Sequence, residues 1–373
     1  MKTKIFSATI LLLALTLLSS VIRKTNSSQC QQPPAEFSII DTLKAYCDSF
    51  PVNAEFAVAV VSKGKANYYG VRKESNKVVE ISNKDAVFEI GSMTKVFTSV
   101  ITATCVQNGQ LRLDDPIQEY LHVPLRKING AAPLITIQNL ANHSSGFQRG
   151  PSNMNPQKQD DPYADYDTTL LYQYLRDSLV LDNPPGTRFA YSNLGVGILG
   201  FICAEILHKS YEAAVKEIVF QPLGMNSSFI QIPANMQNKL VQGLDQDGNN
   251  TSNWNLTNVF VGAGGIRSTA ADIAKFLLAN LDPNGKLGEA LSITQQVTFS
   301  MDSVAGLGLG WFVFRRNGNT RLYHNGGTGG FRSCMIVDKT TQRAVVVLNN
   351  VSGFHPMNRK IDELCRKLVE IKE

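Results

Sequence analysis

Strand-like segments lie at both ends of this chain, and their distribution limits the fold more than any other feature. Near the N-terminus, the Val-rich segment 56–61 and the segment 67–71 flank Lys63, Gly64 and Lys65, which is typical of a β-hairpin. Near the C-terminus, four more strand-like segments alternate with turn residues: 310–315, 320–324, 331–337 and 343–348. The two groups predict one antiparallel sheet built from both chain ends.

The middle of the chain has a different pattern, with apolar residues at helical spacing and long loops rich in Gly, Pro and Asn. The predicted helices are 94–107, 135–142, 168–179, 194–208, 211–219 and 270–281, with two more near the ends at 37–50 and 357–371. We therefore expect an α/β (α+β) fold. Its antiparallel sheet, from about 51–90 and 305–350, is flanked by helices, with a mostly helical region, about 91–300, inserted.

The N-terminus has the pattern of a secretory signal peptide. Lys2 and Lys4 precede the apolar run 5–22, so residues 1–24 predict a signal peptide and a secreted or extracytoplasmic protein. A retained membrane anchor is the alternative, because a run of this length is at the lower limit for spanning a bilayer. The polar segment 25–35 predicts a linker, and residues 36–373 predict one folded domain.

The charge distribution gives little support to a nucleic-acid-binding function. The net charge is +5, from 36 basic and 31 acidic residues, but four of the basic residues lie in the first 24 positions, where no acid occurs. The remainder is nearly neutral, so it forms no broad basic surface.

Seven Asn-X-Ser/Thr sequons make the chain a candidate glycoprotein if it is secreted, although an Asn-rich chain also contains sequons by chance. They begin at Asn26, Asn142, Asn226, Asn249, Asn250, Asn255 and Asn350.

The six cysteines show no Cys-X-X-Cys spacing, and the five histidines are scattered, so the sequence predicts no metal site. We expect a disulfide between Cys47 and Cys365, because each lies on a terminal helix and the sheet places those helices side by side. Cys30 is an alternative disulfide partner for either Cys47 or Cys365. Cys105 and Cys203 lie on apolar helical faces and are expected to act as small buried hydrophobic residues.

Ser92 and Lys95 form a candidate nucleophile and base. Ser92 lies at the start of the helix 94–107, and Lys95 follows three positions later on the same helix face. A buried lysine amine loses its charge and can then take the proton of a serine hydroxyl. The alternative is an ordinary helix-capping serine with a surface lysine, and the spacing by itself does not exclude it.

Two other short motifs could line the same cleft. Tyr191 and Asn193 precede an apolar helix; the phenol can transfer protons, and the amide can hold a substrate amide. His324, Gly326 and Gly327 end a strand, where glycines allow a ligand to approach closely and an N–H can complete an oxyanion hole with the Ser92 N–H. Each motif is also compatible with an ordinary turn.

The segment 195–200 matches Gly-X-Gly-X-X-Gly but follows a Pro/Gly loop rather than an apolar strand. We interpret these glycines as close-packing positions on a helix and not as a dinucleotide-binding loop.

Taken in order, these motifs resemble the serine β-lactamase/penicillin-binding protein family. The resemblance is to the branch of class C β-lactamases, D,D-carboxypeptidases, D-aminopeptidases and related esterases, and it covers roughly residues 37–370. The segments that carry it are 88–95, 113–116, 140–146, 185–186, 191–193, 222–225, 264–269 and 324–326.

The resemblance implies acyl transfer through a serine ester, without a metal or organic cofactor. Ser92 is then the nucleophile, while Lys95 and Tyr191 share proton transfer and Tyr191 protonates the leaving group. The substrate contacts implied are Asn193 to the substrate amide, His324 on the opposite wall, Gln148 reaching the cleft, and the N–H groups of Ser92 and Gly327 as oxyanion hole.

One departure bears on the substrate. Class C β-lactamases typically have Lys-Thr-Gly at the third motif, whereas this chain has His324, Asn325 and Gly326. An unperturbed histidine loses its charge near pH 6.5, so we expect carboxylate-bearing substrates to bind less well as the pH rises from about 6 to 8. The sequence thus predicts a secreted serine hydrolase of peptide, amide or ester substrates, with a β-lactamase or a catalytically idle binding protein as alternatives.

Overall fold

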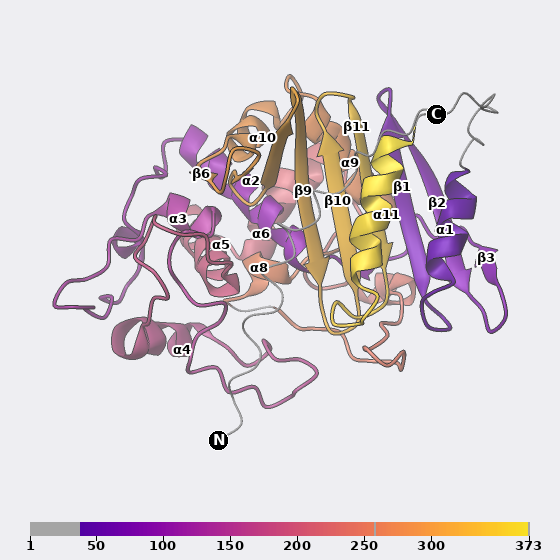
Figure 1. Ribbon diagram of the computed structural model, residues 1–373. Coiled ribbons are helices and arrows are strands. Elements are labelled where there is room, and N and C mark those ends of the chain that lie inside the picture. The colour runs from indigo at the N-terminus through magenta and orange to yellow at the C-terminus, as the bar shows by residue number, and fades with distance from the viewer. Residues whose placement is uncertain (1–37, 257–258, 372–373) are drawn as a thin grey trace, which may run out of the picture. The chain divides into compact units, whose positions relative to one another are not determined.

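Both ends of the chain contribute strands to one sheet in the computed structural model, which describes residues 38–256 and 259–371. The strands of this sheet are β1 (Glu55–Ser62), β2 (Lys65–Lys73), β3 (Val78–Glu80), β6 (Phe299–Ser300), β7 (Ala305–Leu307), β8 (Phe312–Arg316), β9 (Asn319–Gly327), β10 (Arg332–Asp338) and β11 (Arg343–Asn349). They lie in the order β3-β2-β1-β11-β10-β9-β8-β7-β6, and each neighbouring pair with a recorded register is antiparallel (Figure 1). The predicted fold class is confirmed.

The pairing of β1 with β11 joins the two chain ends at the centre of the sheet. Val58 lies opposite Val347 and Val60 opposite Val345, so β-branched side chains face one another across the junction. On its other side, β1 pairs with β2 through a tight hairpin in which Ser62 lies opposite Lys65. The helical region is therefore inserted between strands that are neighbours in space but distant in sequence.

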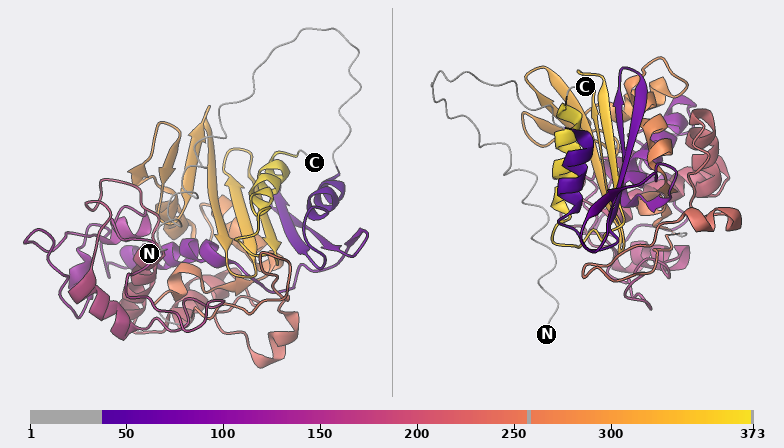
Figure 2. Two further views of the ribbon diagram at one scale, coloured as in Figure 1. Left: turned by 60° about the horizontal axis from the view of Figure 1, so that its bottom comes forward. Right: turned by 90° about the vertical axis from the view of Figure 1, so that its right-hand side faces the viewer.

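Helices cover both faces of the sheet (Figure 2). On one face lie α1 (Ile39–Cys47) and α11 (Arg359–Glu370), and on the other lies α9 (Ala270–Leu281) with the helical region beyond it. Alternation along β1 serves both layers: Val58 and Val60 pack in the α1/α11 cluster, whereas Ala57 and Ala59 pack in the cluster with α9.

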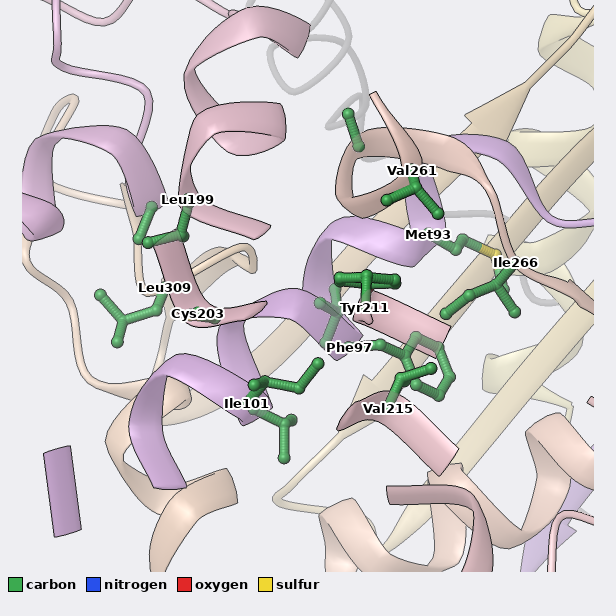
Figure 3. Packing of buried hydrophobic residues seen from close by; sticks show 14 of the residues in the cluster. Met93, Phe97, Ile101, Leu199, Cys203, Tyr211, Val215, Val261, Ile266 and Leu309 are labelled. Carbon is green, nitrogen blue, oxygen red and sulfur yellow. The ribbon is translucent and has the colours of Figure 1, made fainter. Parts of the chain in front are cut away.

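The helix α2 (Thr94–Gln107) lies at the centre of the helical region, surrounded by α5 (Asn193–Leu207), α6 (Tyr211–Val215) and α8 (Val261–Gly264). Phe97 and Ile101 of α2 are buried among residues of α5 and α6 (Figure 3). The Phe97 ring stacks on that of Phe276 in α9 at a centroid distance of 4.2 Å. Each such buried side chain contributes about 1.5–3 kcal/mol, so this packing holds the start of α2 in place.

The remaining elements are short and connect these layers. They are β4 (Phe88–Glu89) and β5 (Arg267–Ser268), which pair with each other, α3 (Ile137–Ala141), α4 (Thr168–Gln173), α7 (Gln221–Leu223) and α10 (Gly288–Gln295), with single turns at Gly91–Met93, Ile117–Tyr120, Tyr174–Ser178, Lys216–Phe220 and Ala234–Lys239. The sequence did not predict α10, β3 or β6, because segments this short carry little periodicity.

The glycines of segment 195–200 are packing positions on α5, as predicted. A Cβ atom on Gly200 would lie 3.0 Å from the Cα atom of Gly262 in α8, so the two helices approach each other backbone to backbone.

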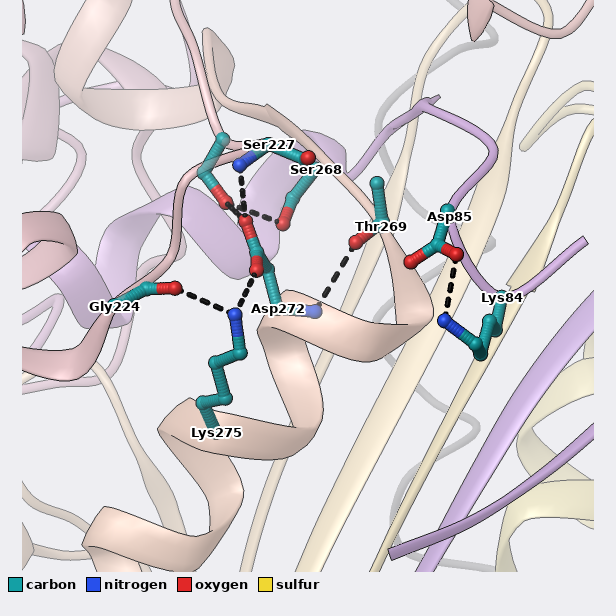
Figure 4. Close-up of polar contacts among 9 residues, drawn as sticks. Lys84, Asp85, Gly224, Ser227, Ser268, Thr269, Asp272 and Lys275 are labelled. Atoms are coloured by element: carbon teal, nitrogen blue, oxygen red, sulfur yellow. Dashed lines mark hydrogen bonds and ion pairs between the residues drawn. The ribbon is translucent and has the colours of Figure 1, made fainter.

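The first turn of α9 is fixed by polar contacts around one buried carboxylate (Figure 4). The hydroxyl of Thr269 accepts a hydrogen bond from the Asp272 N–H at 3.1 Å, which caps the helix. The Asp272 carboxylate accepts from the Ser227 N–H at 2.7 Å and the Ser228 hydroxyl at 2.9 Å. Lys275 pairs with the same carboxylate at 2.8 Å.

The predicted disulfide between Cys47 and Cys365 is not formed. Both thiols are free and buried; the Cys47 thiol donates to the carbonyl of Ala54, and the Cys365 thiol to that of Cys334. The two helices do lie side by side, but each cysteine points into the apolar layer between its own helix and the sheet. Cys105 and Cys203 are buried, as predicted.

Two of the predicted sequons are inaccessible in the folded chain. Asn142 donates to Thr298, and Asn350 donates to the carbonyls of Asn53 and Gln242; both side chains are buried. The four exposed candidates are Asn226, Asn249, Asn250 and Asn255. Asn26, Cys30, the predicted signal peptide or anchor at 1–24 and the linker at 25–35 lie outside the described residues.

Within the described ranges, no single helix has the length and apolarity to cross a membrane, and one bent pair, Asn193–Leu207 with Tyr211–Leu223, meets the criterion by length and composition only.

Candidate active site

Ser92 lies in a single helical turn, Gly91–Met93, that leads directly into α2. Lys95 follows in the first turn of α2 and has no exposed surface (0 %). The alternative of a surface lysine is therefore wrong. Both residues belong to one continuous backbone segment that the core of the helical region holds in place.

The side-chain nitrogen of Lys95 has three uncharged partners. Nζ lies 2.9 Å from Ser92 Oγ, 2.9 Å from Asn193 Oδ1 and 2.7 Å from the carbonyl oxygen of Ala263. Burial lowers the pKa of this amine well below its usual range, and the charge of Arg149 lowers it further. Both effects favour the uncharged form of the Lys95 amine. The sequence did not identify Ala263, since a backbone acceptor on a distant helix leaves no sequence signal.

Tyr191 lies against the same pair of residues. Its ring centroid is 5.0 Å from Lys95 Nζ, and its hydroxyl is hydrogen-bonded to Ser92. Burial raises the pKa of Tyr191, while Arg149 and the Ser92 hydrogen bond oppose part of that rise. The structure thus brings together Ser92, Lys95 and Tyr191 from two motifs about a hundred residues apart.

Local contacts of the second motif orient Tyr191 and Asn193. The Ser192 hydroxyl accepts from the Gly195 N–H at 2.9 Å, which caps α5, and donates to the Gln148 carbonyl at 2.7 Å. The amide of Asn193 donates to the Tyr163 hydroxyl at 3.1 Å, leaving its oxygen to Lys95.

The end of β9 runs past the turn that carries Ser92. A Cβ atom on Gly326 would lie 2.0 Å from the Ile90 carbonyl oxygen and 2.9 Å from the Ser92 nitrogen, so only glycine allows this approach. The Ser333 hydroxyl on β10 donates to the same Ile90 carbonyl at 2.8 Å and holds the turn against the strand. β9 continues to Gly327, three residues beyond the predicted strand end, and brings that residue against Gly91, which directly precedes Ser92.

His324 does not have the charge that we expected. Its side chain is 1 % exposed, its Nδ1 lies 2.7 Å from the Asn325 carbonyl oxygen, and its Nε2 has no partner among the described residues. Burial, followed by the field of Lys95, lowers the pKa of His324 to about 3. The imidazole is therefore neutral throughout pH 6–8, and the predicted titration in that range is wrong.

A cation that the sequence analysis missed lies at the end of β9. Arg332 faces Gly327 across the β9–β10 pair, and its Nη1 is 3.7 Å from the position of a Cβ atom on Gly327. Its Nη2 donates to Asp362 of α11, which also accepts from the Asn325 side chain at 2.9 Å. Asn325 therefore points towards α11 rather than into the site.

The loop after α3 contributes two further residues that the sequence analysis missed. The ring of His143 lies 4.4 Å from that of Tyr191, and the guanidinium of Arg149 lies 5.3 Å from it. Gln148, which we expected to reach the cleft, instead donates its amide to Asp182 at 3.1 Å. His143 lies in, and Arg149 just beyond, the family-like segment 140–146, and that proximity was the available signal.

Among the described residues, no group of three or more His, Cys, Asp or Glu side chains is placed to hold a metal ion.

Comparison with known protein families shows which family this chain belongs to. The model of the family described as β-lactamase matches residues 53–369. The chain belongs to the β-lactamase family. The predicted resemblance to serine β-lactamases and penicillin-binding proteins is confirmed, as is the expectation of an enzyme of this family.

Members of the β-lactamase family with different names match this chain to a similar degree. It is 28 % identical over 268 residues to a β-lactamase of Pseudomonas fluorescens, covering 70 % of each chain. It is 27 % identical over 320 residues to the D-alanyl-D-alanine-carboxypeptidase/endopeptidase AmpH of Escherichia coli, covering 80 % of each. A solved class C β-lactamase superimposes with a TM-score of 0.74 at 22 % identity, covering 90 % of this chain and 96 % of the other.

For several other curated β-lactamases, including that of Yersinia enterocolitica, the chain spans less than two thirds of the relative's length, 64 % in that case.

Proposed function

We propose that this β-lactamase family member is a secreted serine hydrolase that acts through an acyl-Ser92 intermediate on peptide, amide or ester substrates. The observation that carries the proposal is the environment of the Lys95 amine. A neutral amine has two N–H groups and one lone pair, and the oxygens of Asn193 and Ala263 can only accept hydrogen bonds. In the neutral amine these oxygens would engage the two N–H groups, and the lone pair would then be free to take the proton of the Ser92 hydroxyl, whose oxygen lies 2.9 Å from Nζ.

In the acylation step, Lys95 takes the Ser92 proton as Oγ forms a bond to the substrate carbonyl carbon. The N–H groups of Ser92 and Gly327 stabilise the negative charge on the carbonyl oxygen. Tyr191, hydrogen-bonded to Ser92, passes a proton to the leaving nitrogen or oxygen as its bond to carbon breaks. Water then attacks the ester, gives up its proton to the same pair of residues and releases the acid and free Ser92.

Asn193 is suited to hold the substrate amide through its side chain, which already bridges Lys95 and Tyr163. We assign the reading of substrate charge to Arg332 rather than to His324. Arg332 keeps its charge at every relevant pH, and its guanidinium lies beside Gly327, whereas His324 is buried and neutral. His324 lines the wall of the site as a neutral group.

A β-lactamase is the second candidate, supported by the names of the curated relatives. The third motif argues against efficient turnover of β-lactams, because no lysine ammonium stands at its first position. A catalytically idle binding protein is disfavoured, since recognition alone does not require a buried neutral amine against a serine hydroxyl.

The decisive experiment combines labelling with turnover. Wild-type protein and Ser92→Ala are treated with a fluorophosphonate probe, and the adduct is located by peptide mass spectrometry. Hydrolysis of a D-Ala-D-Ala peptide, a short-chain ester and a chromogenic cephalosporin is then measured for both proteins. We expect an adduct on Ser92 and faster turnover of peptide or ester than of the cephalosporin. An unlabelled wild-type protein that turns over none of the three would refute the proposal.

Secretion is tested separately. Expression of the full chain in a secreting host, followed by N-terminal sequencing of the product in the medium, is expected to show cleavage within or just after residues 1–24. Full-length protein held in the membrane fraction would instead indicate an anchor.

A further inference from the structure

Arg149 places a positive charge beside Tyr191, and among the described residues no carboxylate pairs with that charge. Its guanidinium carbon lies 5.3 Å from the centroid of the Tyr191 ring. The side chain is exposed, and the structure records no ion pair between Arg149 and a carboxylate within the described ranges. Its neighbour Gln148 takes the nearby Asp182 as a partner instead.

Hydrogen bonds to its carbonyl fix the main chain at Arg149. The carbonyl oxygen of Arg149 accepts hydrogen bonds from the N–H groups of Asn193 at 3.0 Å and Leu194 at 3.2 Å, at the start of α5. The carbonyl of the preceding residue accepts from the Ser192 hydroxyl. The loop that carries Arg149 is thus attached to the motif that carries Tyr191.

The groups that face Tyr191 come from three parts of the chain. These are Ser92 and Lys95 at the start of α2, His143 and Arg149 of the loop after α3, and Arg332 of β10. Burial holds the pKa of His143 well below its usual range, so this imidazole is neutral at neutral pH, and burial also lowers the pKa of Lys95, which favours the uncharged amine. Arg332 is paired with Asp362, which leaves Arg149 as the unpaired cation of this set.

We propose that Arg149 is a positioning residue that places a permanent positive charge beside Tyr191 and thereby favours the proton-accepting form of Lys95 and loss of the Tyr191 proton. The inference rests on the proposed function, because it concerns the proton transfers of that reaction. A positive charge disfavours protonation of a neighbouring amine and favours loss of a phenol proton. The first effect keeps Lys95 ready to take the proton of Ser92, and the second eases transfer of the Tyr191 proton to the leaving group.

Removal of the Arg149 charge is expected to move the pH dependence of kcat/KM in one direction. Removing the charge raises the pKa of both Lys95 and Tyr191, so fewer molecules hold Lys95 as the free amine at a given pH. The acidic limb of the pH profile of kcat/KM then moves to higher pH. Because Arg149 is exposed, the effective dielectric constant is high, and we expect a shift of about 0.5–1 pH unit that weakens at high salt.

The experiment compares three variants on a neutral ester substrate. Arg149→Gln removes the charge, Arg149→Lys retains it, and Arg316→Gln makes the same change in net charge at the β8–β9 hairpin, the opposite end of β9 from Gly327. We expect the acidic limb to shift in Arg149→Gln alone, through kcat rather than KM. An unmoved limb in that variant, or an equal shift in Arg316→Gln, would overturn the proposal.

A second measurement does not depend on turnover. The ring ¹³Cζ signal of Tyr191, assigned by its loss in Tyr191→Phe, reports ionisation of the phenol. At a given alkaline pH, Arg149→Gln is expected to show a smaller ionised fraction than wild type, and Arg149→Lys the same fraction. If the signal responds in this way but Ser92 is never acylated, the electrostatic role stands and the proposed function fails. If the signal is unchanged in Arg149→Gln, the role of Arg149 is refuted whatever the activity.

Discussion

The nitrogen of Lys95 lies 2.9 Å from the hydroxyl oxygen of Ser92, and its other hydrogen-bond partners are two oxygen atoms that cannot donate. None of these three partners is a carboxylate, and burial lowers the pKa of the amine well below its usual range, which favours its uncharged form. The arrangement turns an ordinary pair of side chains on one helix into a base and a nucleophile.

Ser92→Ala is expected to abolish fluorophosphonate labelling and nearly all hydrolysis, because the Ser92 hydroxyl is the nucleophile that we assign. The fold should be unaffected, since the change removes one oxygen at a helix start. Thermal unfolding by circular dichroism controls for stability. Retention of a tenth of wild-type turnover would show that another residue is the nucleophile.

Lys95→Ala is expected to slow acylation about 10³-fold or more, because a neutral hydroxyl is a poor nucleophile without a base. The variant also leaves the Asn193 oxygen and the Ala263 carbonyl without their donor, at a cost of about 1–3 kcal/mol each. Stopped-flow acylation and urea unfolding separate the two effects. Lys209→Ala, at an exposed lysine, is the control and should change neither.

Tyr191→Phe keeps the ring between His143 and Arg149 but removes the hydroxyl that contacts Ser92. We expect a loss of about 10²-fold or more in kcat, the usual effect of losing one positioned proton-transfer group. A good leaving group needs less protonation, so the loss should be smaller for a nitrophenyl ester than for an alkyl ester. Equal losses on both esters would show that Tyr191 does not protonate the leaving group.

Arg332→Gln is expected to raise KM about tenfold for substrates that carry a carboxylate beside the scissile bond and to leave neutral esters unchanged. One charge contact in a hydrated site contributes about 1 kcal/mol, which sets this magnitude. Because the change leaves Asp362 without its cation, the double variant Arg332→Gln/Asp362→Asn tests whether misfolding is responsible. Equal effects on charged and neutral substrates in the double variant would exclude Arg332 as the charge reader.

His324 stays neutral through pH 6–8, so KM for carboxylate-bearing substrates should vary in parallel with KM for neutral esters over that range. The same burial of His324 lowers the stability of the folded chain in acid. The unfolded chain binds a proton at His324 below about pH 6.5, whereas the folded chain does so only near pH 3, so stability falls as the pH drops from 6.5 towards 3. Urea unfolding at pH 7 and pH 5, for wild type and His324→Asn, measures the contribution of His324 to the pH dependence of the free energy of unfolding. A pH dependence that is the same in both proteins would contradict it.

Most of the sheet and its helical insertion could be predicted from local patterns, because hydrophobic periodicity reports which face of each element is buried. The helix 94–107 and the helix 270–281 were predicted with the bounds that the structure shows. The shortest strands were not, and β9 runs to Gly327 because its last residues pair with β10 rather than because of any local preference.

The sequence by itself determined the spacing of Ser92 and Lys95 on one helix and the grouping of the three motifs, since both depend on short segments of chain. Only the tertiary structure decided their chemistry. The lowered pKa values of Lys95 and His324, the charge of Arg149 beside Tyr191, the place of Arg332 beside Gly327 and the free state of Cys47 and Cys365 all arise from packing between distant segments. Burial and electric field are properties of the surroundings in three dimensions, and no local pattern of residue types encodes them.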